Sequence, residues 1–294
     1  MSDPVGILVV DKPAGITSHG VVGRVRKALG TRKVGHAGTL DPDATGVLVV
    51  GVGQATRLLG YLASSDKAYV STIVLGETTV TDDAAGEVTA TFDAAALTES
   101  EVARAMSEFV GEIQQRPSAV SAIKVAGKRA YDLVRSGEDV ELSARPVTVH
   151  SFDLLGMRHE RRDERTVAMI DVSVSCSAGT YVRALARDLG ERLGSGGHVS
   201  TLRRTRSGAF DLVDAVSLDD VRSAAQLMSA AQAARRTLPA VEIDADAARL
   251  ARHGVQLPWP TGVAGDPTAF IHGDDLVGVA QQRGDRAVWA AVFG

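Results

Sequence analysis

The chain has 294 residues and a net charge of −4, with 45% hydrophobic and 23% charged residues, which is typical of a soluble globular protein. Its only cysteine, Cys176, excludes an intramolecular disulfide and a cysteine-based metal cluster. No apolar run approaches the ~18 residues that span a bilayer, and the N-terminus has no signal-peptide pattern, so we expect a cytoplasmic protein without membrane association.

Hydrophobic periodicity predicts a series of short elements in the first quarter of the chain. A buried strand at residues 6–10 precedes a helix over residues 18–29, with Ser18 as its N-cap. Residues 31–46 are rich in glycine and are predicted to be irregular. The next expected elements are an apolar strand at 47–52, a helix at 55–62 and an alternating strand at 67–75.

The middle of the chain is predicted to mix strands and helices without a βαβ repeat. A helix over residues 98–110 has Thr98 at its N-cap and Glu101 at the capping-box position. The other expected elements are extended segments at 121–125 and 147–155 around a helix near 129–135, a strand at 166–176 and a helix at 181–193. This mixture predicts an α+β fold, in which a mixed, largely antiparallel sheet is flanked by helices.

The pattern of hydrophobic residues changes around residues 236–239. The remainder has one short helical pattern at 245–253 and three short apolar runs, at 269–271, 276–279 and 287–293. We therefore predict a large domain over residues 1–236 and a small, strand-rich domain over residues 237–294.

The distribution of basic residues bears on the class of partner. The negative net charge alone argues against a nucleic-acid partner. However, residues 12–40 contain six basic side chains and no acidic one. Screening limits the reach of distant acidic charges to about 8–10 Å, so a local basic surface still attracts phosphates, although each cluster is equally compatible with a solvated helix face. Two further clusters are Arg203, Arg204 and Arg206, and Lys124, Lys128 and Arg129.

Asp41 is the strongest candidate for chemistry, since it lies in a glycine-rich loop. Gly35, Gly38 and Gly46 permit tight turns, and Pro42 biases Asp41 toward an extended conformation. A carboxylate held in this way can act as a nucleophile, a base or a metal ligand. It can equally be the acceptor of an ordinary Asp-Pro turn.

Several motifs in a fixed order resemble those of the bacterial tRNA pseudouridine-55 synthases, the TruB family. Together they cover about residues 6–210 with little interruption, which is far more specific than any single motif. The motifs are DKPAGITS (11–18), GHAGTLDPDATG (35–46), KAY (67–69), LGETT (75–79), Gly86 after an acidic pair, RPSAVSAIK (116–124), GKRAY (127–131), GTYVR (179–183) and LRR (202–204).

The resemblance implies the pseudouridine synthase fold and a catalytic group of three residues. Asp41 matches the aspartate that acts on uridine 55 in the T-arm of tRNA, where the N-glycosidic bond breaks and the base rejoins the sugar through C5. Tyr69 matches the tyrosine that stacks on the uracil, and Arg183 matches the arginine that pairs with the catalytic carboxylate. An arginine there favours the ionised carboxylate.

The resemblance also implies contacts with the RNA. Tyr181 and Leu202 match pocket residues near the base, His36 matches the histidine that fills the space left by flipped bases, and Lys12 lies in a motif near the RNA backbone. Residues 118–147 resemble an inserted thumb that grips the RNA, and the C-terminal part resembles a shortened PUA domain, a small β-barrel. The basic residues suited to phosphate contacts are Lys124, Lys128, Arg129 and Arg203.

We expect no cofactor and no metal site, and we expect a monomer that acts on tRNA and requires no protein partner. Two alternatives remain. Asp43 departs from the family pattern and completes a D-x-D-x-T motif with Asp41, as in magnesium-dependent phosphatases, but that motif should end an apolar strand within βαβ units. A non-catalytic RNA-binding or tRNA-folding protein could keep the same scaffold. We expect Asp43 to point to solvent.

Overall fold

The computed structural model describes residues 3–118, 124–125, 128–129, 142–263 and 265–294. Within it the chain separates into two compact units. Unit 1 comprises Met1–Ser65 and Arg206–Gly294, and unit 2 comprises Asp66–Thr205. This division differs from the boundary predicted after residue 236, which stays a prediction. Most of the predicted thumb, with the helix expected near 129–135, lies outside the described residues apart from its ends and two short strands.

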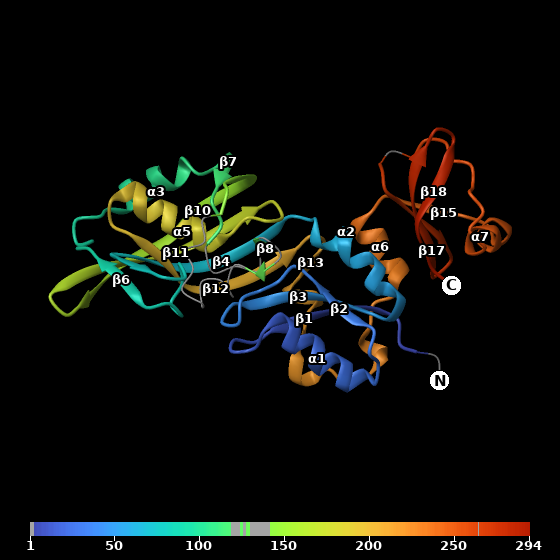
Figure 1. Cartoon of the computed structure of the whole chain (residues 1–294), viewed down its shortest axis with the longest axis horizontal. Helices are drawn as coiled ribbons and strands as arrows, with labels where there is room; N and C mark the ends of the chain where they lie inside the picture. The colour runs from blue at the N-terminus through green and yellow to red at the C-terminus, as the bar shows by residue number, and fades with distance from the viewer. Residues whose placement is uncertain (1–2, 119–123, 126–127, 130–141, 264) are drawn as a thin grey trace. The chain divides into compact units, whose positions relative to one another are not determined.

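Unit 1 is built on three neighbouring strands with helices on both faces (Figure 1). β3 pairs antiparallel with both β1 and β2, and the short β14 joins β1 in parallel. Both faces of β1 and β3 are buried, so these strands are apolar at nearly every position. The elements before the C-terminal sheet are β1 (Gly6–Lys12), α1 (Ser18–Leu29), β2 (Val34–Ala37), β3 (Thr45–Val52), η1 (Gly53–Leu58), α2 (Leu59–Ala63), β13 (Phe210–Asp211), η2 (Leu212–Asp214), β14 (Val216–Ser217), η3 (Leu218–Asp220), η4 (Ala224–Gln226) and α6 (Ala230–Thr237).

The C-terminal part of unit 1 is an open sheet of four strands, so the predicted β-barrel is wrong. The strand order is β15-β16-β17-β18. On one face Phe270 and Val277 pack with α7, and on the other Ile271 and Val279 join the cluster that includes Ile7 of β1. Other elements bury both faces of this sheet, so its apolar residues are covered without closure into a barrel. The elements are β15 (Ala240–Glu242), α7 (Ala245–Arg252), β16 (Thr268–His272), β17 (Asp275–Arg283) and β18 (Arg286–Val292).

Unit 2 is an antiparallel sheet covered on one face by two helices, α3 and α5 (Figure 1). Its strand order is β12-β4-β11-β10-β7. Apolar residues of β4, β10 and β11 share one core with α3 and α5. The elements are β4 (Lys67–Leu75), β5 (Glu77–Thr79), β6 (Val88–Thr91), α3 (Glu99–Ser107), β7 (Gly111–Gln115), β8 (Lys124–Val125), β9 (Lys128–Arg129), β10 (Arg145–Arg162), β11 (Arg165–Cys176), α5 (Val182–Leu193) and β12 (Gly197–Ser207), whose last two residues belong to unit 1.

The predicted α+β class with a largely antiparallel sheet is confirmed. The capping box of Thr98 and Glu101 forms as expected at the start of α3. Ser18, however, is not the N-cap of α1, because Thr17 fills that position and accepts from the backbone N–H of Gly20 at 2.9 Å. The segment predicted to be irregular contains β2, which is held by pairing with β3.

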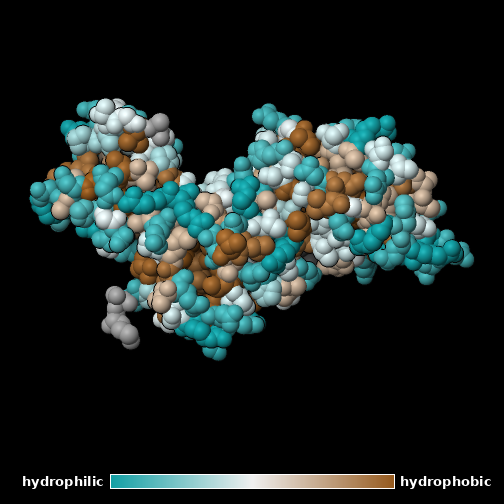
Figure 2. Space-filling model, turned by 180° about the vertical axis from the view of Figure 1, so that it is seen from behind, coloured by the Kyte–Doolittle hydropathy of each residue, from teal (hydrophilic) through white to brown (hydrophobic). Residues whose placement is uncertain are grey.

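The length of the helices and the distribution of hydrophobic residues on the surface bear on contacts with a membrane or a partner. None of the described helices is long and apolar enough to cross a membrane. On the face that Figure 2 shows, hydrophobic side chains form several patches separated by hydrophilic ones. Exposed apolar residues such as Val88, Leu155 and Val213 lie far apart in the sequence.

A chain that ends at Arg236 should unfold at a lower temperature than the full chain. The truncation uncovers the face of unit 1 on which Ile271, Val279 and Phe293 are buried together with Ile7 and Leu58. The measurement is thermal unfolding of both chains by circular dichroism. An unchanged melting temperature would show that the segment after residue 236 is an independent domain with little buried contact.

Candidate functional site

In unit 1, Asp41 lies in the loop that connects β2 with β3. Register pairs Ala37 with Val49, so the loop begins directly after β2. Gly38 and Gly46 adopt φ values of 80° and 98°, which side chains rarely tolerate, and they allow the chain to turn at both ends of the loop. Asp41 is half-buried, whereas Asp43 is exposed as expected.

Lys12 anchors the loop from the C-terminal side of Asp41. Its side chain is fully buried, and its Nζ donates to the carbonyls of Pro13 at 2.9 Å, Pro42 at 2.8 Å and Ala44 at 2.6 Å. The backbone N–H of Gly15 also donates to Pro42, at 3.0 Å. Lys12 therefore holds the backbone beside Asp41. Its expected place near the RNA backbone stays a prediction.

Ser18 anchors the loop from the other side. Its hydroxyl donates to the carbonyl of Leu40 at 3.0 Å and accepts from the N–H of Leu40 at 2.8 Å. Both backbone groups of the residue before Asp41 are therefore fixed by one buried side chain. Asp41 therefore lies between two anchored segments of the loop.

His36 lies in β2, opposite Val50 of β3, and is half-buried. A Cβ atom at the preceding Gly35 would lie 2.9 Å from Leu59 Cδ1, so a glycine lets α2 approach this strand closely. His36 and Asp41 therefore belong to one hairpin of unit 1. The role of His36 in filling space between bases stays a prediction.

In unit 2, Tyr69 and Leu202 lie on the neighbouring strands β4 and β12. Both are half-buried and pack against the core that α5 covers. Ser71 of β4 donates to the carbonyl of Thr201 at 2.7 Å, which ties the two strands beside these side chains. The structure thus brings two of the predicted pocket residues to one region of the sheet.

Tyr181 and Arg183 lie at the start of α5, where Tyr181 is the N-cap residue. Arg183 is buried, and its Nη1 donates to the carbonyl of Thr81 at 2.9 Å and to Asp83 Oδ2 at 3.2 Å. These two contacts hold the guanidinium in a defined direction. Its predicted pairing with Asp41, which belongs to the other unit, stays a prediction.

The predicted basic cluster of β12 does not form a single surface. Arg204 is fully buried, while Arg203 is half-buried, because successive side chains of a strand point to opposite faces. Lys124 and Arg129 are paired across β8 and β9, with Val125 opposite Lys128, and their side chains lie outside what the structure describes. The expected phosphate contacts of these residues stay predictions.

Lys67 is a buried cation that the sequence alone did not single out. It begins β4 directly opposite Cys176 of β11. Burial, reinforced by the Arg204 guanidinium, lowers the pKa of Lys67 to about 8, and burial raises the pKa of the Cys176 thiol to about 11. The signal that could have marked Lys67 is its position two residues before Tyr69, on the same side of the strand.

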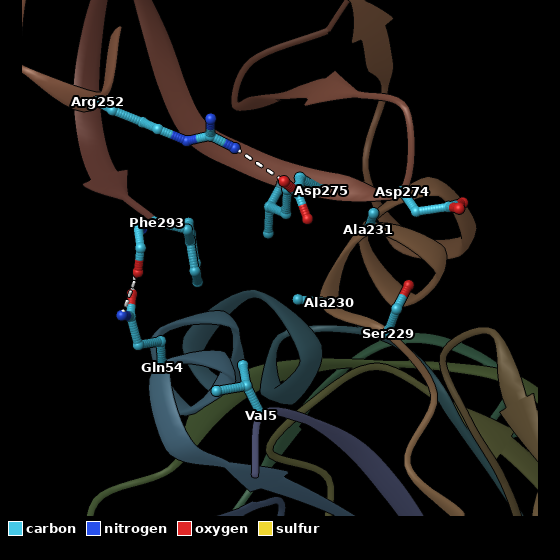
Figure 3. Close-up of a pocket in the computed structure, with 11 residues that line it drawn as sticks. Val5, Gln54, Ser229, Ala230, Ala231, Arg252, Asp274, Asp275 and Phe293 are labelled. Carbon is cyan, nitrogen blue, oxygen red and sulfur yellow. Dashed lines mark hydrogen bonds and ion pairs between the residues drawn. The ribbon is translucent and has the colours of Figure 1, made fainter. Parts of the chain in front are cut away.

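A separate pocket lies in unit 1, at the contact between the C-terminal sheet and the elements around η1 (Figure 3). Its volume is about 260 Å³, and Arg252 and Asp275 form an ion pair of 2.9 Å at its wall. No residue of the predicted site lines it. Among the described residues, no group of three or more histidine, cysteine, aspartate or glutamate side chains could hold a metal ion.

Lys12→Met should destabilise the protein by about 1–3 kcal/mol, because three carbonyls lose the Lys12 donor and the Lys12–Ala44 hydrogen bond among them is buried. Hydrogen exchange of the amides at 43–45 should also become faster, since the loop loses its anchor. Lys27→Met, an exposed change on α1, is the matched control. Equal stability and equal exchange in the Lys12 variant would contradict the anchoring role.

Lys67 should make the protein more stable as pH rises from 7 to 9. An unfolded lysine keeps its proton up to a pKa of about 10.4, so in this window the unfolded state binds more protons than the folded state. The gain relative to Lys67→Met should be about 1 kcal/mol. Cys176 acts in the opposite direction above its ordinary pKa but is common to both proteins. Denaturant unfolding at both pH values tests this, and an identical pH dependence of the two proteins would refute it.

Comparison with known proteins assigns the chain to a family. The family model described as "TruB family pseudouridylate synthase (N terminal domain)" matches residues 26–182, and the one described as "tRNA pseudouridylate synthase B C-terminal domain" matches residues 183–244. Relatives called tRNA pseudouridine synthase B include one of Arthrobacter sp. (strain FB24), 54% identical over 90% of this chain and 85% of the relative. Another, of Corynebacterium aurimucosum, is 50% identical over 100% of this chain and 98% of the relative.

Solved structures agree with this assignment. An H/ACA RNP bound to a substrate RNA containing 2′-deoxyuridine has a chain with a TM-score of 0.74 and 26% identity, covering 99% of this chain and 86% of that one. A Cbf5-Nop10-Gar1 complex has a TM-score of 0.72 and 28% identity, covering 98% and 85%. The matched family models together span residues 26–244, which include Asp41, Tyr69 and Arg183. The chain therefore belongs to the TruB family of pseudouridylate synthases.

Proposed function

We propose that this chain isomerises uridine 55 in the T-arm of tRNA to pseudouridine. The reaction breaks the bond between C1′ and N1 and forms a bond between C1′ and C5, while C5 loses a proton and N1 gains one. Apart from these protons nothing is gained or lost, so the reaction needs no oxidant or reductant.

One observation carries this proposal, namely the fixed backbone on both sides of Asp41. Ser18 holds Leu40, and Lys12 holds Pro42 and Ala44. A catalytic group that is already oriented loses little freedom when the substrate arrives, which lowers the barrier of the chemical step. An aspartate in an ordinary surface turn would not need two buried polar side chains to fix its neighbours.

In this proposal Tyr69 of unit 2 contacts the uracil base, and Arg183 of unit 2 pairs with the Asp41 carboxylate. A uridine in an RNA loop must leave its stack before a side chain can reach it, which costs a few kcal/mol. Stacking on Tyr69 would return about 1–3 kcal/mol of this cost. Arg183 would pair with the Asp41 carboxylate and keep it ionised, and its contacts with Thr81 and Asp83 support this role because they orient the guanidinium.

The chain is proposed to act as a monomer in the cytoplasm, where tRNA is the substrate and no protein partner is required. The Cbf5 structures contain partner proteins, Nop10 and Gar1 in one of them. The relatives called tRNA pseudouridine synthase B match this chain at much higher identity and over almost its full length. This difference favours an enzyme that finds its RNA without additional subunits.

Purified chain should form pseudouridine at position 55 of an unmodified tRNA transcript, with no cofactor added. Asp41→Asn should lower the rate by at least roughly a hundredfold. RNA affinity should stay within about threefold, because phosphate contacts elsewhere supply most of it. Asp43→Asn, two residues away and exposed, is the matched control and should keep the wild-type rate.

The measurement is chemical mapping of pseudouridine, together with filter binding of the same RNA. RNA binding without any pseudouridine by the wild-type chain would favour a non-catalytic RNA-binding protein. A normal rate for Asp41→Asn would remove Asp41 from the mechanism.

A further inference from the structure

The chain leaves the sheet of unit 2 at Gln115, a buried residue. β7 ends at Gln115, which pairs with Arg145, the first residue of β10. The segment between these residues, called the insertion below, includes residues 118–144 of the predicted thumb. Gln115, Pro117 and Ser118 are buried, so the base of this segment is part of the core of unit 2 and not a surface loop.

Gln115 binds the backbone of Tyr181 through both ends of its amide. Its Nε2 donates to the carbonyl of Tyr181 at 3.1 Å, and its Oε1 accepts from the N–H of Tyr181 at 2.8 Å. This reciprocal pair resembles a backbone bridge between two strands. Because the amide is buried, the loss of either contact would leave a buried polar group without a hydrogen-bond partner. One side chain thus fixes the residue at which α5 begins.

Arg187, on the next turn of α5, contacts its neighbour Asp188 and two segments outside the helix. Its Nη2 donates to the carbonyl of Arg116 at 2.7 Å, directly beyond Gln115. Its Nη1 binds Asp82 Oδ2 at 3.1 Å, and its Nε and Nη2 bind Asp188 Oδ1 at 2.9 and 2.7 Å. The guanidinium therefore links α5, the loop around Asp82 and the base of the insertion.

The loop that Arg187 holds is the same loop that orients Arg183. Asp82 binds Arg187, and the next residue, Asp83, binds Arg183 at 3.2 Å. Asp82 has a φ of 58°, an uncommon conformation for aspartate that the surrounding contacts must maintain. Backbone hydrogen bonds from Val199 to Asp82 and from Ala84 to Val199 tie the loop to β12. A shift of Arg187 would therefore reach the partners of Arg183.

We propose that Gln115 and Arg187 are positioning residues for the uridine site. They connect residues 115–118, where the insertion begins, to Tyr181 and Arg183 at the start of α5. Neither needs to touch the substrate. Gln115 fixes the backbone of Tyr181, and Arg187 fixes the loop from which Arg183 takes its direction. This inference rests on the proposed function, because Tyr181 and Arg183 have their roles only in a pseudouridine synthase.

The test compares single-turnover rates at saturating tRNA for wild type, Arg187→Met, Arg187→Lys and Gln115→Glu. Gln115→Glu keeps the size of the side chain but removes the donor to the Tyr181 carbonyl. Arg192→Met is the matched control on the same helix, since Arg192 also binds a carboxylate through two contacts, at 2.7 Å each to Glu108, but is exposed. Gln114→Glu, the exposed neighbour in β7, is the control for Gln115.

Arg187→Met and Gln115→Glu should lower the rate roughly ten- to a hundredfold, because small misplacements of reacting groups have effects of this size. RNA affinity should change by less than about threefold, since phosphate contacts are unaffected. Arg187→Lys should recover part of the rate, because an ammonium cannot span all three segments. Both controls should keep the wild-type rate.

Combining Arg187→Met with Gln115→Glu adds a readout that a purely structural role would not move. If both residues position the start of α5, the rate effects should be less than multiplicative. A wild-type rate in folded Arg187→Met, or a loss of RNA affinity with an unchanged rate, would overturn the inference. If Arg187→Met fails to fold, Arg187→Lys and Gln115→Glu decide in the same way. An inactive wild type would refute the proposed function itself.

Discussion

The buried ammonium of Lys12 is the interaction on which the position of Asp41 depends. Burial of an unpartnered charge costs several kcal/mol, so Lys12 stays buried only while carbonyls surround it. Two of the three carbonyls that bind Lys12 belong to Pro42 and Ala44. If the loop moved away, the charge would lose these two acceptors. One electrostatic requirement therefore fixes the backbone beside Asp41 before any RNA binds.

Elements with a local cause could be predicted from the sequence, and elements held by distant partners could not. α3 follows from its capping box and apolar stripe, and β4 lies where a strand was predicted at 67–75, in a run rich in β-branched residues. β2 lies in a glycine-rich stretch that carries no strand pattern, and it is extended because β3 pairs with it. β12 is rich in polar residues and becomes a strand beside β4. Tertiary pairing outweighs local propensity in both cases.

The same distinction holds for the site. Motif resemblance marked Asp41 and Arg183 as candidate site residues, but it did not show which side chains hold them. Ser18 was expected to cap a helix and instead fixes Leu40. Gln115 reaches Tyr181 across 66 positions, and Arg187 reaches Arg116 across 71. A single side chain that binds a distant backbone group leaves no periodic pattern, so only the folded chain reveals it.

Burial and ion pairing also decide which basic residues can meet the phosphates of an RNA. Counts from the sequence include Lys12 and Arg204, which are buried. In unit 1, Arg32 and Lys33 are exposed directly before β2, the strand that carries His36 and leads to Asp41. Acidic residues farther away are screened within about 8–10 Å, so they do not cancel the field of these two cations. A protein of net charge −4 can therefore attract RNA at this hairpin, because affinity for phosphate depends on local charge more than on the total.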